Sequence, residues 1–155
     1  QEIPLKQNAD TLNLNLDAPF PEIKNIPAVC VNMGNPHAVF FLPHVEKIDI
    51  SKIGSWVENH PMFPKRTNVE FAEVLDKSHI RMRVWERGAG ITQACGTGAC
   101  ATLVAAVRLN LIEKEADIIL DGGTLHVLWQ KNADGSDEVI MSGPATKVFA
   151  SEFSI

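Results

Sequence analysis

Hydrophobic and polar positions alternate along several short stretches of this chain, and the alternation predicts β-strands. In the clearest case, Ile80, Met82 and Val84 are separated by Arg81 and Arg83. A two-residue period places one side of a strand in the core and the other toward water. Turn-forming residues separate these stretches from one another. The strands predicted in this way are 11–17, 28–33, 37–42, 68–75, 80–86, 117–120, 124–130, 138–141 and 147–153.

One stretch has a different pattern, because it is apolar without alternation. The run from Ala99 to Val107 carries no charge. A helix that is apolar all round is a buried helix, and we expect one over about 96–109, roughly 20 Å long. A shorter helix is predicted before Pro61, with Ser51 as its N-cap.

Many strands linked by turns, together with one buried helix, predict an α+β fold. An antiparallel sheet usually hides one face and exposes the other. A helix without a polar face needs cover on every side. We therefore expect a curved, mainly antiparallel, barrel-like sheet wrapped around a buried central helix.

Composition narrows the function classes. The 155 residues fit one domain. The net charge of −5 and the absence of a basic cluster argue against nucleic acid as a partner, and no apolar run has membrane length. Three cysteines without a secretory signal favour the cytoplasm. The chain begins with Gln1 rather than Met, and we expect it to be a piece of a longer protein.

The cysteines provide the first candidate chemistry. Cys95 precedes the segment Gly96-Thr97-Gly98 and the predicted buried helix. Unpaired N–H groups at a helix N-terminus favour a thiolate and bind anions. Composition leaves two interpretations open: a reactive thiol, or a packed thiol beside an anion-binding turn. Cys30 and Cys100 lie in apolar runs and are predicted to be packing residues. No cysteine or histidine spacing is typical of a metal site, so none is expected.

The other polar candidates are ambiguous one by one. Glu86 and Arg87 end a predicted strand and could simply be solvated. Asn35 suits a turn, His37 could be a hydrogen-bonded strand residue, and Asn68 alone indicates nothing.

Taken in order, however, these residues lie in segments that resemble the C-terminal half of the diaminopimelate epimerase family. The resemblance covers nearly the whole chain from about residue 28, and the segment around Cys95 is the most specific. The segments are Gly34-Asn35-Pro36-His37, Thr67-Asn68-Val69-Glu70-Phe71, Glu86-Arg87-Gly88-Ala89-Gly90 and Ala94-Cys95-Gly96-Thr97-Gly98-Ala99-Cys100-Ala101.

The resemblance implies one half of a pseudo-symmetric two-domain epimerase. Residues 1–155 would be the C-terminal domain, with 149–155 belonging to the crossover between domains. Such an isomerase interconverts LL- and meso-2,6-diaminopimelate for lysine and peptidoglycan-precursor biosynthesis. It uses two cysteines as acid and base and needs neither pyridoxal phosphate nor metal. The implied partners are this small-molecule substrate and the N-terminal half, with a homodimer left open.

The resemblance also implies roles for individual residues. Cys95 would be one of the two acid/base thiols, with His37 near it and Glu86 holding the reacting ammonium group. The implied substrate contacts are Asn35, Asn68 and Arg87 at the distal end, Glu86 at the ammonium group, and the backbone N–H groups of Gly96 and Thr97 at the reacting carboxylate.

Two departures from the family pattern affect these expectations. Ile91 stands where the family usually has glutamate, and no second Cys-Gly segment is present. We therefore expect this polypeptide alone to have no epimerase activity. A helix dipole lowers a pKa by only about one unit, so Cys95 should be largely a thiol at neutral pH, and a resting thiolate would need a cation such as His37.

Three other functions remain open on the sequence. A related cofactor-independent racemase, such as a proline racemase relative, would share the thiol chemistry but not the substrate. A cysteine hydrolase is less favoured, since no paired histidine context is evident for Cys95. The third is a non-catalytic anion-binding module.

Overall fold

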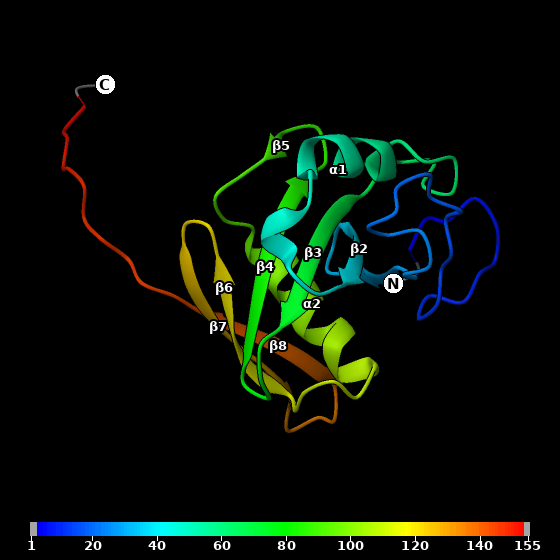
Figure 1. Cartoon of the computed structure of the whole chain (residues 1–155). Helices are drawn as coiled ribbons and strands as arrows, with labels where there is room; N and C mark the ends of the chain where they lie inside the picture. Colours follow the sequence, from blue (N-terminus) through cyan, green and yellow to red (C-terminus); the bar gives the residue numbers. More distant parts are fainter. Residues whose placement is uncertain (1–2, 154–155) are drawn as a thin grey trace.

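The computed structural model describes residues 3–153 and folds them around one curved sheet (Figure 1). The helical elements of this part are a short 3-10 helix, η1 (Val45–Lys47), and two α-helices, α1 (Ile50–Glu58) and α2 (Gly96–Arg108). The strands are β1 (Val29–Asn32), β2 (Pro36–Phe41), β3 (Asn68–Val74), β4 (His79–Glu86), β5 (Gly90–Ile91), β6 (Glu115–Leu120), β7 (Gly123–Lys131) and β8 (Asp137–Ser142).

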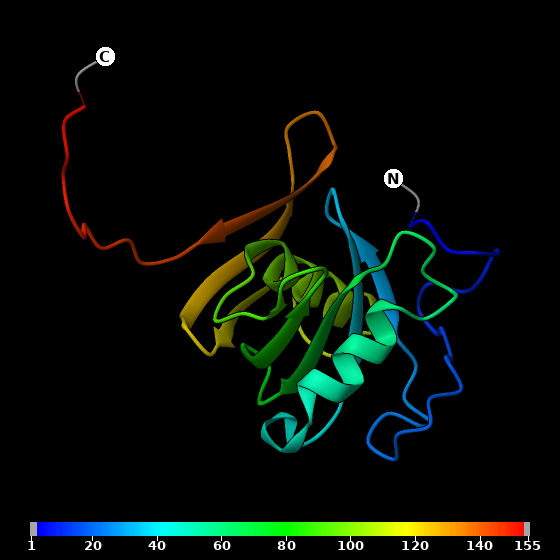
Figure 2. The same cartoon turned by 90° about the horizontal axis from the view of Figure 1, so that it is seen from above.

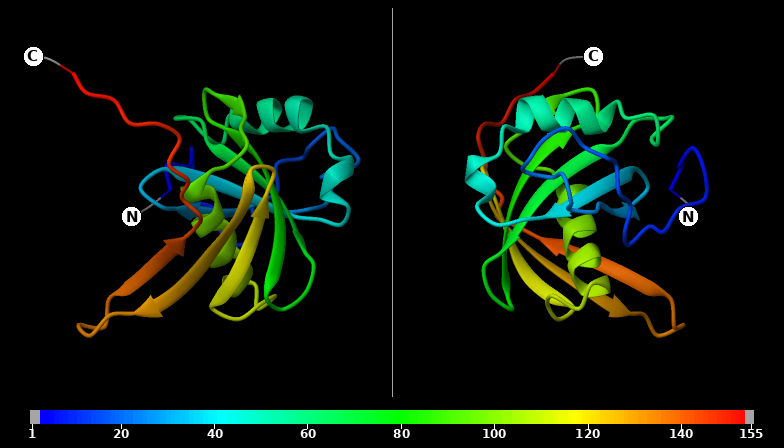
Figure 3. Two further views of the ribbon diagram at one scale, coloured as in Figure 1. Left: turned by 90° about the vertical axis from the view of Figure 1, so that its left-hand side faces the viewer. Right: turned by 45° about the vertical axis from the view of Figure 1, so that its right-hand side comes forward.

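The sheet is mainly antiparallel and wraps around α2. Its order is β1-β2-β3-β4-β6-β7-β8, with β5 paired to β4. Only the β2–β3 and β4–β6 pairs are parallel. Figure 3 shows the strands curling past α2, which lies inside the curve. The predicted α+β architecture, with a curved sheet around a central helix, is confirmed.

The two faces of the sheet carry separate cores. Ile80, Met82 and Val84 are buried against α2, as their alternation predicts. The opposite face is covered by α1, which buries Ile53 and Val57 (Figure 2). Both cores therefore hold β3 and β4 in place between the helices.

The first predicted strand, 11–17, is wrong as a strand, although its burial pattern is right. Leu14 and Leu16 are buried, but the segment forms only an isolated bridge between Leu14 and Ala28. The side-chain oxygen of Asn15 accepts the N–H of Asp17 instead. Such local side-chain bonds satisfy backbone donors that a strand would pair with its neighbour.

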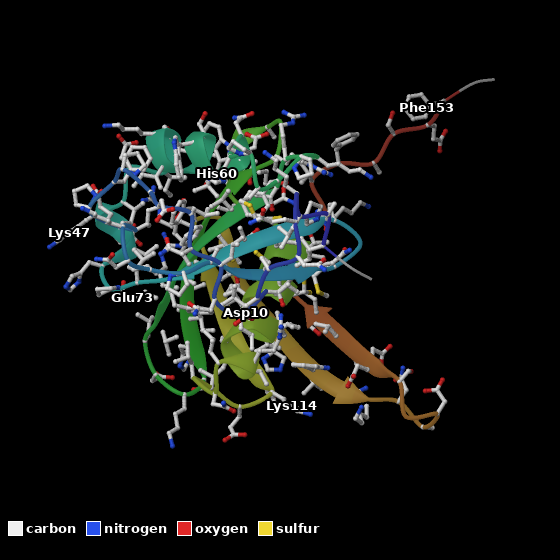
Figure 4. The ribbon with its side chains drawn as sticks, turned by 90° about the vertical axis from the view of Figure 1, so that its right-hand side faces the viewer. Asp10, Lys47, His60, Glu73, Lys114 and Phe153 are labelled. Carbon is white, nitrogen blue, oxygen red and sulfur yellow. The ribbon has the colours of Figure 1, made fainter. Side chains whose placement is uncertain are left out.

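The predicted strand 147–153 is also wrong. Residues 143–153 form no strand and extend away from the sheet (Figure 1). Val148 and Phe149 are 87% and 78% exposed, and Phe153 lies far from the body of the molecule (Figure 4). A strand needs a neighbour for its N–H and C=O groups, and this segment pairs with none of residues 3–153. The last two residues of the predicted crossover, 154–155, lie outside the described residues.

Helix boundaries differ slightly from the predictions. The N-cap of α1 is Asp49 rather than Ser51, because the Asp49 carboxylate accepts the N–H of Lys52 at 3.1 Å. The buried helix ends at Arg108, one residue before the predicted end. Neither helix in the described part of the chain is long and apolar enough to cross a membrane.

Candidate active site

Cys95 lies at the N-terminus of the buried helix, as predicted. It is the N-cap residue of α2, with extended backbone, and only 7% of its surface is exposed. The first N–H groups of a helix have no partner within the helix, so those of Gly96 and Thr97 are available beside the thiol. A methyl group at Gly98 would lie 3.1 Å from the Cys95 sulfur. Glycine at this position therefore lets the thiol pack against the first turn.

Burial decides the protonation state of this thiol. It raises the pKa of Cys95 to about 11, and the nearby carboxylates of Glu70 and Glu86 act in the same direction. Hydrogen bonds from the N–H of Gly98 and the hydroxyl of Thr97 lower the pKa, but by less than burial raises it. Cys95 is thus a thiol at neutral pH, as expected, but the direction of the shift is opposite to the one predicted from the helix dipole.

The remaining cysteines are buried. Burial raises the pKa of Cys30 to about 12 and also raises that of Cys100. Both are inert thiols in apolar surroundings, which agrees with their predicted role in packing.

His37 is fully buried on β2, and both of its ring nitrogens have partners. Nδ1 lies 2.6 Å from Oε1 of Glu70, and Nε2 lies 3.0 Å from Oδ1 of Asn35. The parallel register pairs His37 with Asn68, so Glu70 follows two residues later on the same face of the sheet. The ring therefore does not bond to Cys95 directly, and no Cys–His pair of the hydrolase type is formed.

Asn35 and Thr97 fill the space between His37 and Cys95. The Asn35 amide nitrogen donates to the Thr97 hydroxyl at 3.3 Å. The same hydroxyl lies 3.7 Å from the Cys95 sulfur. Four of the predicted site residues thus form one continuous chain of polar contacts.

Glu86 ends β4 on the same side of the site. Its carboxylate accepts the hydroxyl of Thr92, and its carbonyl oxygen accepts the N–H of Ala89 at 3.0 Å. Gly88 and Gly90 have φ values of 79° and 83°, which glycine adopts without strain. These glycines turn the chain sharply after Glu86 and lead it back toward Cys95.

Asn68 and Arg87 are brought together, though in different environments. Asn68 is buried at the start of β3, where its oxygen accepts the N–H of Arg87 and its nitrogen donates to the Pro36 carbonyl. The Arg87 guanidinium is on the exposed surface and donates to the Lys65 carbonyl at 3.1 Å. Their proposed contact with the distal end of a substrate stays a prediction.

Two buried carboxylates at the site were missed by the sequence analysis. Glu70 is the partner of His37. Glu58, at the end of α1, accepts hydrogen bonds from Trp85 Nε1 at 2.7 Å, the N–H of Gly88 at 2.9 Å and Arg66 Nη1 at 3.1 Å. Glu70 could have been found from the sequence, because it is a carboxylate within an otherwise mostly apolar strand. No sequence pattern indicates Glu58.

Two apolar side chains border the site. Ile91, which stands where the family usually has glutamate, is 45% exposed on β5 and pairs with Trp85. Met141 on β8 covers the start of α2, because a methyl group at Gly96 would lie 3.1 Å from the Met141 sulfur. The mouth of the site is therefore partly apolar.

Comparison with known proteins agrees with the resemblance in the sequence. The family model described as diaminopimelate epimerase matches residues 29–148. The diaminopimelate epimerase of Rhodospirillum centenum is 49% identical over 154 residues, covering 99% of this chain and 50% of that protein. The enzyme of that name from Bacteroides thetaiotaomicron is 55% identical over 122 residues, covering 79% of this chain and 45% of that protein. The chain thus spans about half the length of these relatives.

Solved structures share the fold at low sequence identity. A phenazine biosynthesis protein of the PhzF family from Bacillus anthracis has a TM-score of 0.53 at 22% identity, covering 71% of this chain and 35% of that one. A probable proline racemase from Agrobacterium radiobacter has a TM-score of 0.50 at 18% identity, covering 88% of this chain and 51% of that one. Both similarities concern the fold alone.

Proposed function

Because this chain belongs to the diaminopimelate epimerase family, we propose that it is the C-terminal half of an isomerase that interconverts LL- and meso-2,6-diaminopimelate. The reaction would use two cysteines, one from each half, and neither pyridoxal phosphate nor a metal. The enzyme would act in the cytoplasm, in lysine and peptidoglycan-precursor biosynthesis.

The observation that carries this proposal is the position of Cys95 at the N-terminus of α2. Removing the α-proton of an amino acid sends negative charge into the adjacent carboxylate. Preorganised N–H donors stabilise such charge where it develops. In the proposed complex, the N–H groups of Gly96 and Thr97 receive this carboxylate, which brings the α-carbon next to the thiol.

The protonation state of Cys95 assigns its role in one direction of the reaction. With a pKa raised to about 11, Cys95 is protonated and can act as the acid. A thiolate from the N-terminal half would take the α-proton from one face, and the electron pair of the broken C–H bond would be shared between the α-carbon and the adjacent carboxylate. Cys95 would then deliver its S–H proton to the opposite face, which inverts the centre. In the reverse direction the two thiols exchange roles.

The charged groups around Cys95 suit an amino acid with a second polar end. The Glu86 carboxylate would hold the reacting ammonium group through a charge-assisted hydrogen bond. The exposed Arg87 guanidinium would exchange its bond to the Lys65 carbonyl for one to a distant carboxylate, and Asn35 and Asn68 would complete that end. The proposal is supported by the hydrogen bonds that join Asn35 to Thr97 and Asn68 to the backbone of Arg87.

The test is exchange of the α-proton for solvent deuterium in the protein that contains this chain together with the N-terminal half. We expect LL-diaminopimelate to be converted to the meso form with gain of deuterium, and Cys95→Ala to reduce that conversion about 10²–10⁴-fold, which is the contribution of an acid/base group. The matched control is Cys100→Ala, which removes a buried thiol of the same helix outside the site.

Other outcomes would favour the competing functions. Exchange with proline and none with diaminopimelate would indicate a related racemase. Undiminished conversion of LL- to meso-diaminopimelate in the Cys95→Ala protein would exclude the thiol mechanism. The 155-residue chain alone should show no epimerase activity, because it would supply only one of the two thiols.

A further inference from the structure

Glu70 and His37 form a fully buried pair that the proposed mechanism does not yet use. Neither side chain has exposed surface, and the Glu70 Oε1 to His37 Nδ1 distance is 2.6 Å. The other oxygen of Glu70 has no hydrogen-bond partner within residues 3–153. A buried charge is costly unless an opposite charge compensates it, so the carboxylate strongly favours a proton on the facing Nδ1.

The partners of His37 also define which group donates in each hydrogen bond between His37 and Cys95. Nε2 faces the Asn35 oxygen, which can only accept. With Nδ1 facing a carboxylate, both ring nitrogens donate, and the ring is cationic. Asn35 then donates through its nitrogen to the Thr97 hydroxyl oxygen. The hydroxyl hydrogen of Thr97 is left to point at the Cys95 sulfur, 3.7 Å away.

A neutral His37 that keeps its remaining proton on Nδ1 reverses this direction. Its Nε2 becomes an acceptor and requires the Asn35 nitrogen, so the amide turns over and presents its oxygen to Thr97. The Thr97 hydroxyl now donates to Asn35 and can only accept from Cys95. The two arrangements therefore favour different states of the sulfur: a thiolate receives a hydrogen bond in the first, and a thiol donates one in the second.

We propose that Glu70 is a positioning residue of this site, and that Asn35 and Thr97 relay the protonation state of His37 to Cys95. Glu70 holds the cationic ring, which turns the Thr97 hydroxyl toward the sulfur and favours the thiolate. Loss of the cation turns the hydroxyl away and favours the thiol. This inference rests on the proposed function only in taking Cys95 as the acid/base group.

The relay and the direct charge of Glu70 have opposite effects on the fraction of Cys95 that is thiolate. The proposal can therefore be tested by whether Glu70→Gln raises or lowers that fraction. The carboxylates facing Cys95 are Glu70 on β3 and Glu86 on β4, and the neighbouring hydroxyl on α2 is that of Thr97. Through space, removing the charge of Glu70 would favour the thiolate. Through the relay, the same removal would leave His37 neutral, with the glutamine oxygen of Glu70→Gln accepting from Nδ1 and Nε2 left as an acceptor, and would favour the thiol.

The experiment measures alkylation of Cys95 by iodoacetamide in the whole chain, with peptide mapping by mass spectrometry. We expect Glu70→Gln to slow the reaction of Cys95 roughly tenfold at pH 8, the size of one hydrogen bond to a charged group. Thr97→Val should slow it similarly, and Thr97→Ser should restore the rate because it keeps the hydroxyl. The double variant Glu70→Gln/Thr97→Val should be no slower than Thr97→Val.

Faster alkylation in Glu70→Gln, or additive effects in the double variant, would overturn the relay. Cys30 and Cys100 are internal controls, since their alkylation would reveal a variant that opens or unfolds. If Glu70→Gln does open, the comparison of Thr97→Val with Thr97→Ser decides, and equal alkylation rates of Cys95 in these two variants reject the proposal. Because no substrate is used, the relay can be wrong while the proposed epimerase function holds. Equally, the relay can be right while the proposed function is wrong.

Discussion

The side-chain oxygen of Asn68 accepts the backbone N–H of Arg87 at 2.9 Å, while the nitrogen of the same amide donates to the carbonyl of Pro36 at 2.9 Å. One side chain therefore ties the end of β4 to the segment that carries Asn35 and His37. The spacing of the site depends on this bridge, because each segment it joins contributes residues around Cys95.

Replacement of Asn68 should test the bridge. Asn68→Ala leaves a carbonyl and an N–H unpaired at a position that is only 4% exposed. Each unpaired buried group costs roughly 1–3 kcal/mol, so we expect the free energy of unfolding in urea to fall by about 2–4 kcal/mol. Asn13→Ala, at an exposed position, is the control and should change it by less than about 0.5 kcal/mol. Equal effects of the two substitutions would show that the bridge contributes nothing.

Glu58 should hold the turn after Glu86 in place. Its carboxylate accepts from the Trp85 indole and the Gly88 backbone, and Glu58→Gln would put an amide donor against one of these donors. We expect a loss of about 1–3 kcal/mol in the free energy of unfolding and faster hydrogen exchange at the Gly88 amide. Glu113→Gln, on the exposed surface, should leave both unchanged. A Gly88 amide that exchanges at the wild-type rate in Glu58→Gln would contradict this role.

Two glycines in the first turn of α2 should respond differently to alanine. A methyl group at Gly98 would lie 2.9 Å from the Glu70 carboxylate, whereas one at Gly96 meets only the flexible end of Met141. Overpacking at Gly98 should cost about 1–3 kcal/mol, while Gly96→Ala should be close to neutral because alanine favours the helix. Thermal unfolding of the two variants measures the difference, and equal melting temperatures would argue against a tight contact at Gly98.

Alkaline pH should destabilise the chain through its buried thiols. Burial raises the pKa of Cys30 to about 12 and that of Cys95 to about 11, from an ordinary value of 9.0. Below about pH 9 the thiols are protonated in both states, and their contribution to stability is complete. Above about pH 9 the unfolded chain loses these protons first. The free energy of unfolding therefore falls as the pH rises from 9 to about 11 for Cys95 and to about 12 for Cys30.

The contribution of Cys30 to the slope of the free energy of unfolding against pH can be measured separately. The chain has no tyrosine, so cysteines and lysines are the side chains that titrate in this range. Urea unfolding of Cys30→Ala between pH 9.5 and 11.5 should show a slope smaller than that of the wild type by roughly 1.4 kcal/mol per pH unit. Parallel curves for the two proteins would mean that Cys30 ionises equally in both states.

The sequence by itself determined the inner face of β4, the central helix and the place of the thiol at its start. The alternation of Ile80, Met82 and Val84 predicted the inner face of β4, and the uncharged run after Ala99 predicted the central helix. These are local patterns, since a two-residue or helical period places side chains without reference to the rest of the chain. The same reasoning placed Cys95 at the start of α2.

Only the tertiary structure decided which distant side chains meet. Glu70 reaches His37 because β2 and β3 pair in parallel with a register that no local period specifies. Glu58 reaches Trp85 and Gly88 because α1 packs across the sheet. The tertiary structure also decided the direction of the Cys95 pKa shift. The helix N-terminus was visible in the sequence, but burial depends on everything folded around the thiol, and burial is the larger effect.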